Sequence, residues 1–175
     1  MSAVSNISSL ISLRRPEISD GQEFVEKMRQ SVALHHPWVY PPLNNRQFRA
    51  YCITRQQPTE DGFLVIDKQN QGIAGVINLS VITRGALDSA YLSYYVAAPY
   101  AGKGFMALGL LSVIDKVFHE LRLHRLEANI QPDNFRSKSL VNRCGFKYEG
   151  FSPKLIKVNG QWRDHERWAL LNPNC

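Results

Sequence analysis

The sequence predicts a single mixed α/β domain over residues 1–175. Apolar runs between residues 63 and 96 are joined by short turns, which predicts antiparallel neighbours because parallel strands need a long crossover. The strand at residues 90–96 leads through a glycine pair into a long amphipathic helix and another strand, the order of a parallel βαβ unit. Asn159-Gly160 between two strand-like segments predicts a terminal hairpin.

The first third of the chain is expected to be mainly helical. A short strand at residues 10–14 precedes a helix from about residue 20 to residue 35, with Asp20 as its N-cap and Glu23 at capping-box spacing. Residues 35–42 hold three prolines and should be irregular, and a second helix is expected over residues 44–57. The side chains expected on the buried faces are Phe24, Met28, Val32, Phe48, Tyr51 and Ile53.

The rest of the chain alternates strands and helices. Strands are expected at residues 63–66, 73–80, 90–96 and 124–130, and a last helix at 135–143 stops before Gly145; the hairpin strands are 146–158 and 161–171. The helix after the glycine pair has an apolar face of Ala107, Leu110, Leu111, Ile114, Val117, Phe118 and Leu121.

The composition predicts a globular protein without a membrane-spanning helix. Hydrophobic content is 44%, no apolar run reaches the ~20 residues of a membrane helix, and the first six residues do not have a signal peptide's pattern. Three widely spaced cysteines favour free thiols in the reducing cytoplasm. The net charge of +6 is concentrated after residue 100, where twelve Lys and Arg face seven Asp and Glu. A positive field there would attract an anionic cofactor or an acidic or RNA-rich partner, and surface lysine and arginine kept for solubility are the equally weighted alternative.

Gly102-Lys103-Gly104 lies between a strand and a helix, where backbone N–H groups can cradle a diphosphate. The plainer alternative is a simple strand-to-helix turn. Residues 102–107 also fit the dinucleotide fingerprint, with Glu127 at the distance of a ribose-binding acid. That fingerprint should open the first βαβ unit, whereas here it lies past the middle of the chain. No Gly-Lys-Ser or Gly-Lys-Thr occurs, so a Walker loop is excluded.

His35-His36 precede Pro37 and suggest a metal ligand pair, but no third ligand has supporting spacing, so no metal site is predicted. Trp38 is expected to pack this loop or to line an opening.

The glycine loop resembles the pyrophosphate loop of the GNAT acetyltransferases, which bind acetyl-coenzyme A. The matching stretch is Ala101, Gly102, Lys103, Gly104, Phe105 and Met106. It departs from the family at Ala101, which replaces Arg or Gln, and at Met106, which replaces a small residue. The change at Ala101 removes a side chain but leaves the backbone donors. The resemblance also implies central strands that splay apart, so that backbone groups of Val96 and Ala98 pair with the pantetheine arm.

A second motif, Asn134-Phe135-Arg136-Ser137 followed by Gly145-Phe146, resembles a later GNAT motif. The resemblance implies that Asn134 contacts pantetheine and that Ser137 protonates the leaving thiolate. From the residues alone, Asn134 is an N-cap and Ser137 supports the first helical turn. Glu127 is a candidate general base through water, or a salt-bridged strand residue, while Tyr91 stands where many relatives carry a glutamate.

The hairpin Gly160-Gln161-Trp162-Arg163-Asp164-His165 resembles RimJ-type ribosomal-protein-alanine N-acetyltransferases. The implied reaction is acetyl transfer to a protein's N-terminal α-amine, with Trp38, Trp162 and Asp164 on the acceptor side. Two alternatives remain open: acetylation of a small amine, or a non-catalytic acyl-coenzyme A-binding module. No nucleic-acid site is identified, no membrane association is expected, and the oligomeric state is open.

Overall fold

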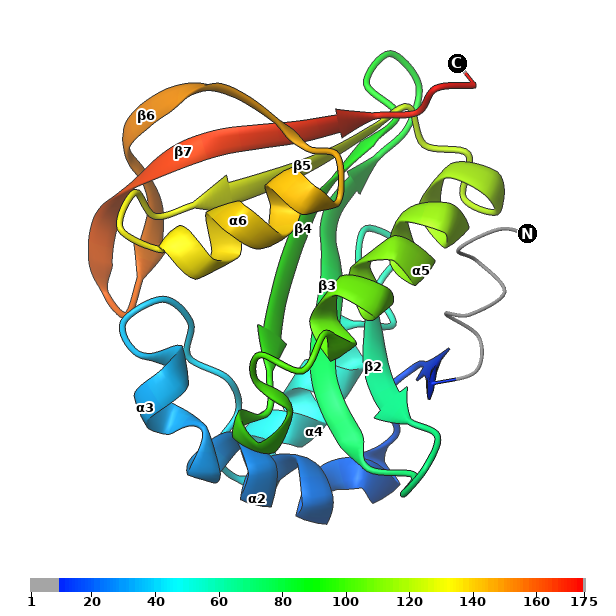
Figure 1. The fold of residues 1–175 in the computed structure, drawn as a ribbon, viewed down its shortest axis with the longest axis vertical. Helices are drawn as coiled ribbons and strands as arrows, with labels where there is room; N and C mark the ends of the chain where they lie inside the picture. Colours follow the sequence, from blue (N-terminus) through cyan, green and yellow to red (C-terminus); the bar gives the residue numbers. More distant parts are fainter. Residues whose placement is uncertain (1–9, 175) are drawn as a thin grey trace.

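The computed structural model describes residues 10–174 as one seven-stranded sheet in the order β1-β2-β3-β4-β5-β7-β6 (Figure 1). The N-terminal segment and Cys175, used above for the targeting and thiol expectations, lie outside the described residues. The elements in chain order are β1 Ile11–Arg14, the 3₁₀ turn η1 Ile18–Asp20, α2 Gly21–Gln30, α3 Val32–His35, α4 Asn45–Thr54, β2 Asp61–Asp67, β3 Ile73–Thr83, β4 Ser89–Val96, the 3₁₀ turn η2 Ala98–Tyr100, α5 Phe105–His119, β5 Arg125–Ile130, α6 Phe135–Arg143, β6 Lys147–Val158 and β7 Gln161–Leu171.

Helices cover both faces of the sheet. α5 packs on β1, β2 and β3, and α6 lies over β5 on the same face (Figure 1). α2 and α4 pack together on the opposite face, where the rings of Phe24 and Phe48 lie 4.3 Å apart and the Tyr51 hydroxyl donates to Asn78 of β3. The predicted mixed α/β domain is confirmed.

The sheet is antiparallel except at its centre, where β4 and β5 run parallel as the βαβ order predicts. Only three residue pairs join them, from Ser89↔Arg125 to Tyr91↔Glu127. Beyond Tyr91 the two strands diverge, so residues 92–96 lose their neighbour on that side (Figure 1). The expected splay of the central strands is therefore present.

The local signals at the chain's second half are confirmed. Asn159 and Gly160 both have positive φ, 45° and 79°, which is the backbone of a two-residue hairpin turn. Gly145 follows α6 with φ 95°, where a left-handed residue ends a helix.

Cys52 and Cys144 are free and buried. No helix within residues 10–174 has the length and apolarity needed to cross a bilayer.

Several helical details differ from the prediction. The first helix is interrupted at Ser31. Asp20 occupies the N-cap position of α2 as predicted, but its side chain makes no capping bond, because the carboxylate binds Arg14 and the N–H of Glu17. Three residues expected inside are exposed instead, since each lies at the edge of its helix's apolar stripe. They are Val32, Ile53 and Leu111.

Candidate functional site

The loop between β4 and α5 has the backbone of a ligand cradle. Gly102 and Gly104 have φ of 74° and 85°, in the left-handed region that side chains disfavour. A Cβ built on either glycine would meet no atom within 4 Å, so open space lies over both. The first helical bond runs from Leu108 N–H to Gly104 O. The N–H groups of residues 105–107 therefore precede the first intrahelical bond and have the arrangement that an anion site requires.

The two departures from the family loop have different structural consequences. Ala101 closes the η2 turn, with its N–H donating to Ala98 O at 3.2 Å. Met106 is buried, and its side chain points into the sheet. A Cβ on Gly75 of β3 would lie 2.4 Å from Met106 Sδ, so the glycine makes room for the methionine. Met106 thus packs away from the open side of the loop, while Lys103 is exposed beside it.

The backbone at the end of β4 is held by the first helices. Ala97 N–H donates to Ala74 O of β3 at 2.9 Å, so the alternation along a strand turns the polar groups of Val96 toward the edge that β5 has left. There His35 Nε2 lies 2.8 Å from Val96 O, and Ser31 Oγ accepts from Ala98 N–H at 2.8 Å. The Ala98 N–H, one of the backbone groups expected to pair with pantetheine, thus has an acceptor within the protein, and the Val96 N–H is the group left facing the splay.

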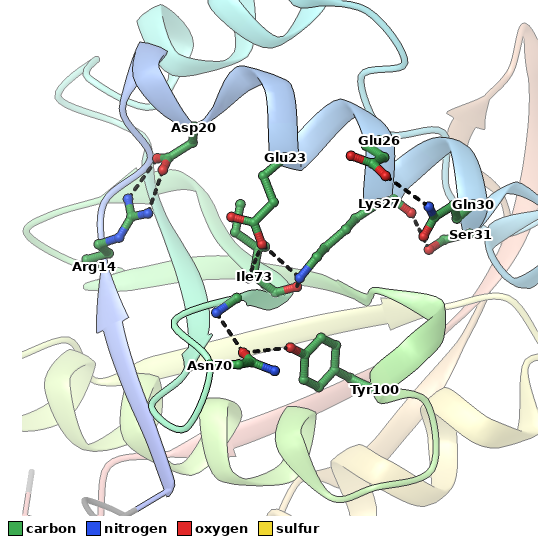
Figure 2. Close-up of polar contacts among 11 residues, drawn as sticks. Arg14, Asp20, Glu23, Glu26, Lys27, Gln30, Ser31, Asn70, Ile73 and Tyr100 are labelled. Carbon is green, nitrogen blue, oxygen red and sulfur yellow. Dashed lines mark hydrogen bonds and ion pairs between the residues drawn. The ribbon is translucent and has the colours of Figure 1, made fainter.

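A polar network joins Tyr100, two residues before Gly102, to α2 and to the β2–β3 turn (Figure 2). The Tyr100 hydroxyl donates to Asn70 Oδ1 at 3.1 Å, and its ring stacks edge-on with Phe105 at 4.9 Å. Lys27 Nζ lies 5.0 Å above the Tyr100 ring and donates to Ile73 O at 3.1 Å. The η2 turn that precedes the glycines is therefore fixed to α2 and to the β2–β3 turn.

Ser137 faces the splay from the first turn of α6. Its Oγ lies 2.6 Å from the Tyr94 hydroxyl, and Asn134 Oδ1 accepts from the Ser137 N–H at 3.2 Å. Asn134 is thus the N-cap of α6, while the Ser137 hydroxyl bonds to Tyr94 of β4 rather than to the backbone of its own helix. Burial raises the pKa of Tyr94, which keeps the phenol protonated as a hydrogen-bond donor.

Glu127 lies on the other face of the sheet from Ser137, because β5 pairs Glu127 with Tyr91 whereas Tyr94 faces α6. Its Oε1 accepts from Arg125 Nε at 2.8 Å, and Arg125 also binds Glu149 through a bidentate contact. These partners raise the pKa of Arg125 and lower that of Glu149. Glu127 is therefore salt-bridged, one of the two roles expected for it.

The three predicted acceptor residues meet in one pocket although 124 positions separate Trp38 from Trp162. This pocket has a volume of about 250 Å³ and lies where β5 ends, between the loop after α3 and the terminal hairpin. Its lining is Trp38, Gln131, Pro132, Asp133, Trp162, Arg163 and Asp164. The Asp164 carboxylate also accepts from Lys154 N–H at 2.8 Å, which fixes its orientation. The arrangement suits a cationic group between two indole walls.

Sequence reasoning missed four residues that the fold brings to this region: Ser31, His35, Tyr94 and Asp133. Tyr94 had a usable signal, since strand alternation places it on the same face as buried Ala90 and Leu92. His35 was considered only as a metal ligand. Within residues 10–174 no three His, Cys, Asp or Glu side chains converge as a metal site would require.

Comparison with known proteins identifies the family. The model of the acetyltransferase (GNAT) domain matches residues 11–147. The chain is 37% identical to the probable N-acetyltransferase YjcK of Bacillus subtilis over 74% of this chain and 71% of that protein. It is 37% identical to the [ribosomal protein uS5]-alanine N-acetyltransferase of Escherichia coli over 64% of this chain, but only 58% of that enzyme.

Two further similarities extend over nearly the whole chain. The spermidine N(1)-acetyltransferase of Vibrio cholerae is 29% identical over 94% of this chain and 95% of its own length. The solved structure of Mycobacterium smegmatis RimJ in complex with CoA-disulfide superposes with a TM-score of 0.85, covering 94% of this chain and 83% of that one at 24% identity. This last similarity establishes the fold.

Proposed function

Because this chain belongs to the GNAT family of N-acetyltransferases, we propose that it transfers the acetyl group of acetyl-CoA to the N-terminal α-amine of a protein. The observation that carries the proposal is the acceptor pocket beside the splay, with two tryptophans and the carboxylates of Asp133 and Asp164. An α-ammonium group fits between the carboxylates, and the peptide chain behind it would lie along the tryptophans. The relative in Escherichia coli that is named as an alanine N-acetyltransferase of ribosomal protein uS5 makes this class of acceptor the first to test.

The residues of the loop fit acetyl-CoA, which would supply an acetyl group already activated as a thioester. The open space over Gly102 and Gly104 and the N-terminal N–H groups of α5 would hold the diphosphate. The Val96 N–H, left free on the splayed edge, would donate to the acetyl oxygen as negative charge develops on it. Asn134, whose Oδ1 caps α6, would present its amide nitrogen to the pantetheine arm.

The absence of an uncommitted base on β5 favours an α-amine as acceptor. Glu127 is held by Arg125, so a strong general base is not at hand there. An α-amine has a pKa near ~8 and a lysine side chain near ~10.4, so at neutral pH a fraction roughly a few hundred times larger of the α-amine is uncharged and nucleophilic. An α-amine that arrives as an ammonium at the carboxylates would still lose its proton before attack, and this deprotonation costs less for an α-amine than for a lysine side chain.

Departure of the thiolate would be assisted from α6. As the new C–N bond forms and the C–S bond breaks, the amine loses one proton and the sulfur takes one up. The Ser137 hydroxyl would pass a proton to the sulfur and regain the one that the amine releases, while the hydrogen bond to the Tyr94 phenol holds the hydroxyl in place. A thiol has a pKa of about 8.5, so a well-placed hydroxyl suffices to assist it.

A polyamine is the second candidate, because paired carboxylates would also bind a polycation and because the relative in Vibrio cholerae acts on spermidine. Arg163 in the same lining opposes a second positive charge, which favours an acceptor with one cationic end.

A panel of acceptors separates the candidates. Thiol release from acetyl-CoA would be measured with peptides that begin with Ala or Ser, with the same peptides blocked at the N-terminus and carrying an internal lysine, and with spermidine. We expect turnover on the free-N-terminus peptides, with the acetyl group located there by mass spectrometry. Asp164→Asn, which keeps the contact to Lys154 but removes the charge, should raise KM for the peptide at least tenfold. Turnover on spermidine alone, or on lysine side chains, would refute the proposal.

A further inference from the structure

Four polar side chains spaced four residues apart form a stripe along α2 and α3: Glu23, Lys27, Ser31 and His35. This spacing places them on one side of the helical segment. Glu23 Oε1 accepts from Ile73 N–H at 2.8 Å, and Lys27 donates to Ile73 O, so the first half of the stripe holds the start of β3 (Figure 2). The second half, Ser31 and His35, holds the end of β4.

Ser31 and His35 bond to the edge of β4 at the end of the strand, where β5 no longer pairs with it. The Val96 carbonyl and the Ala98 N–H lie beyond the last β4–β5 pair, so no strand satisfies them. A buried backbone group without a partner is costly. His35 and Ser31 supply the two missing partners, each at 2.8 Å, and their exposed fractions are 4% and 0%. The Ser31 hydroxyl is itself fixed, because it donates to Lys27 O at 2.6 Å (Figure 2).

We propose that Ser31 and His35 are positioning residues for acetyl transfer: they hold the splay open and fix where the Val96 N–H points. The inference rests on the proposed function, in which that N–H receives the developing charge. Both residues act through backbone and touch neither substrate. Since a displacement of about 1 Å at a reacting group can cost roughly a hundredfold in rate, the His35 bond to Val96 O and the Ser31 bond to the Ala98 N–H two residues further on should both affect kcat.

The geometry also fixes the form of His35. Val96 O can only accept, so Nε2 carries the proton and Nδ1 is bare. Nδ1 is buried and has no hydrogen-bond partner among the described residues, and the ring packs edge-on against Tyr95 at 5.4 Å. The contributions of ring packing and of hydrogen bonding can therefore be separated by substitution. His35→Phe keeps an aromatic ring without a donor, and His35→Gln restores a donor without the ring.

The test compares steady-state kinetics with acetyl-CoA and an Ala-initiated peptide for Ser31→Ala, His35→Phe, His35→Gln and the unchanged enzyme. We expect kcat to fall about ten- to a hundredfold in Ser31→Ala and His35→Phe, with KM for acetyl-CoA changed less than threefold. His35→Gln should recover most of the loss. The matched control is Ser112→Ala, because the Ser112 hydroxyl makes the same bond to the carbonyl four residues back, Leu108 O, and this bond lies within α5. The control should keep its kcat.

Amide hydrogen exchange supplies a readout that does not depend on catalysis. Exchange at Ala98 should accelerate at least tenfold in Ser31→Ala while CoA binding, measured by calorimetry, persists. A lowered melting temperature with unchanged kcat and unchanged Ala98 exchange would overturn the inference and leave the two residues as purely structural. If the unchanged enzyme acetylates no peptide, the proposed acceptor fails, and Ala98 exchange together with kcat on whichever amine is turned over decides the inference separately.

Discussion

The most direct test of the glycine loop is Gly104→Ala. Gly104 has φ 85°, and a Cβ there meets nothing within 4 Å, so the substitution adds one methyl group to the space proposed for the diphosphate without a clash inside the protein. Backbone strain in the left-handed region costs about 1–2 kcal/mol of folding stability. The methyl group also prevents the close approach of the ligand to backbone donors. Losing one charge-assisted hydrogen bond, worth about 1.5–3 kcal/mol, weakens CoA affinity roughly tenfold to a hundredfold.

The chain provides a matched control for this substitution. Gly85, in the loop between β3 and β4, has φ 77° and is likewise open to 4 Å. Gly85→Ala should therefore lose a similar amount of stability in urea unfolding, yet bind CoA normally by isothermal titration calorimetry. If Gly104→Ala and Gly85→Ala bind CoA equally well, the glycine loop does not hold the diphosphate.

Three further perturbations follow from the structure. Ser137→Ala should lower kcat more than it weakens acetyl-CoA binding, since Asn134 rather than Ser137 caps α6; equal kcat in paired melts and rate assays would contradict a role for the hydroxyl. Gly75→Ala should lower the free energy of unfolding by about 1–3 kcal/mol, because the added methyl group overpacks against Met106. Adding Met106→Ala to this variant should recover part of the lost free energy. Urea unfolding of the single and the double variant measures both effects, and no recovery would refute the packing. Burial lowers the pKa of His35 and of His165, so the unfolded chain binds more protons than the folded one in weak acid. The free energy of unfolding should therefore fall as the pH drops from about 7 to about 5, and a rise over that interval would show that the two side chains are not buried neutral.

Much of the fold follows from local signals in the sequence. Asn159-Gly160 adopts the two positive φ values that the hairpin turn requires, and Gly145 ends α6 as a glycine at that position should. The order of strand, glycine loop, helix and strand yields the parallel β4–β5 pair. These features depend on a few neighbouring residues, and the chemistry of those residues does not change when the rest of the chain folds. The edges of helical stripes were less reliable, as exposed Ile53 and Leu111 show, because burial there depends on which element packs alongside.

The sequence by itself determined the backbone of the loop proposed to hold the cofactor, because the conformations of Gly102 and Gly104 and the start of α5 depend on a contiguous stretch of chain. The tertiary structure alone decided which residues line the proposed acceptor pocket and which side chains bond to the backbone at the end of β4. Trp38 and Trp162 share a pocket because β5 and β7 are neighbours in the sheet and because Gln131, which follows β5, donates to Trp38 O. His35 hydrogen-bonds to Val96, which is 61 residues away in the sequence. Arg125 forms an ion pair with Glu127, and no spacing rule predicts this side-chain contact. Each of these pairings is set by how elements distant in sequence pack, and that information is not carried by any short stretch of the chain.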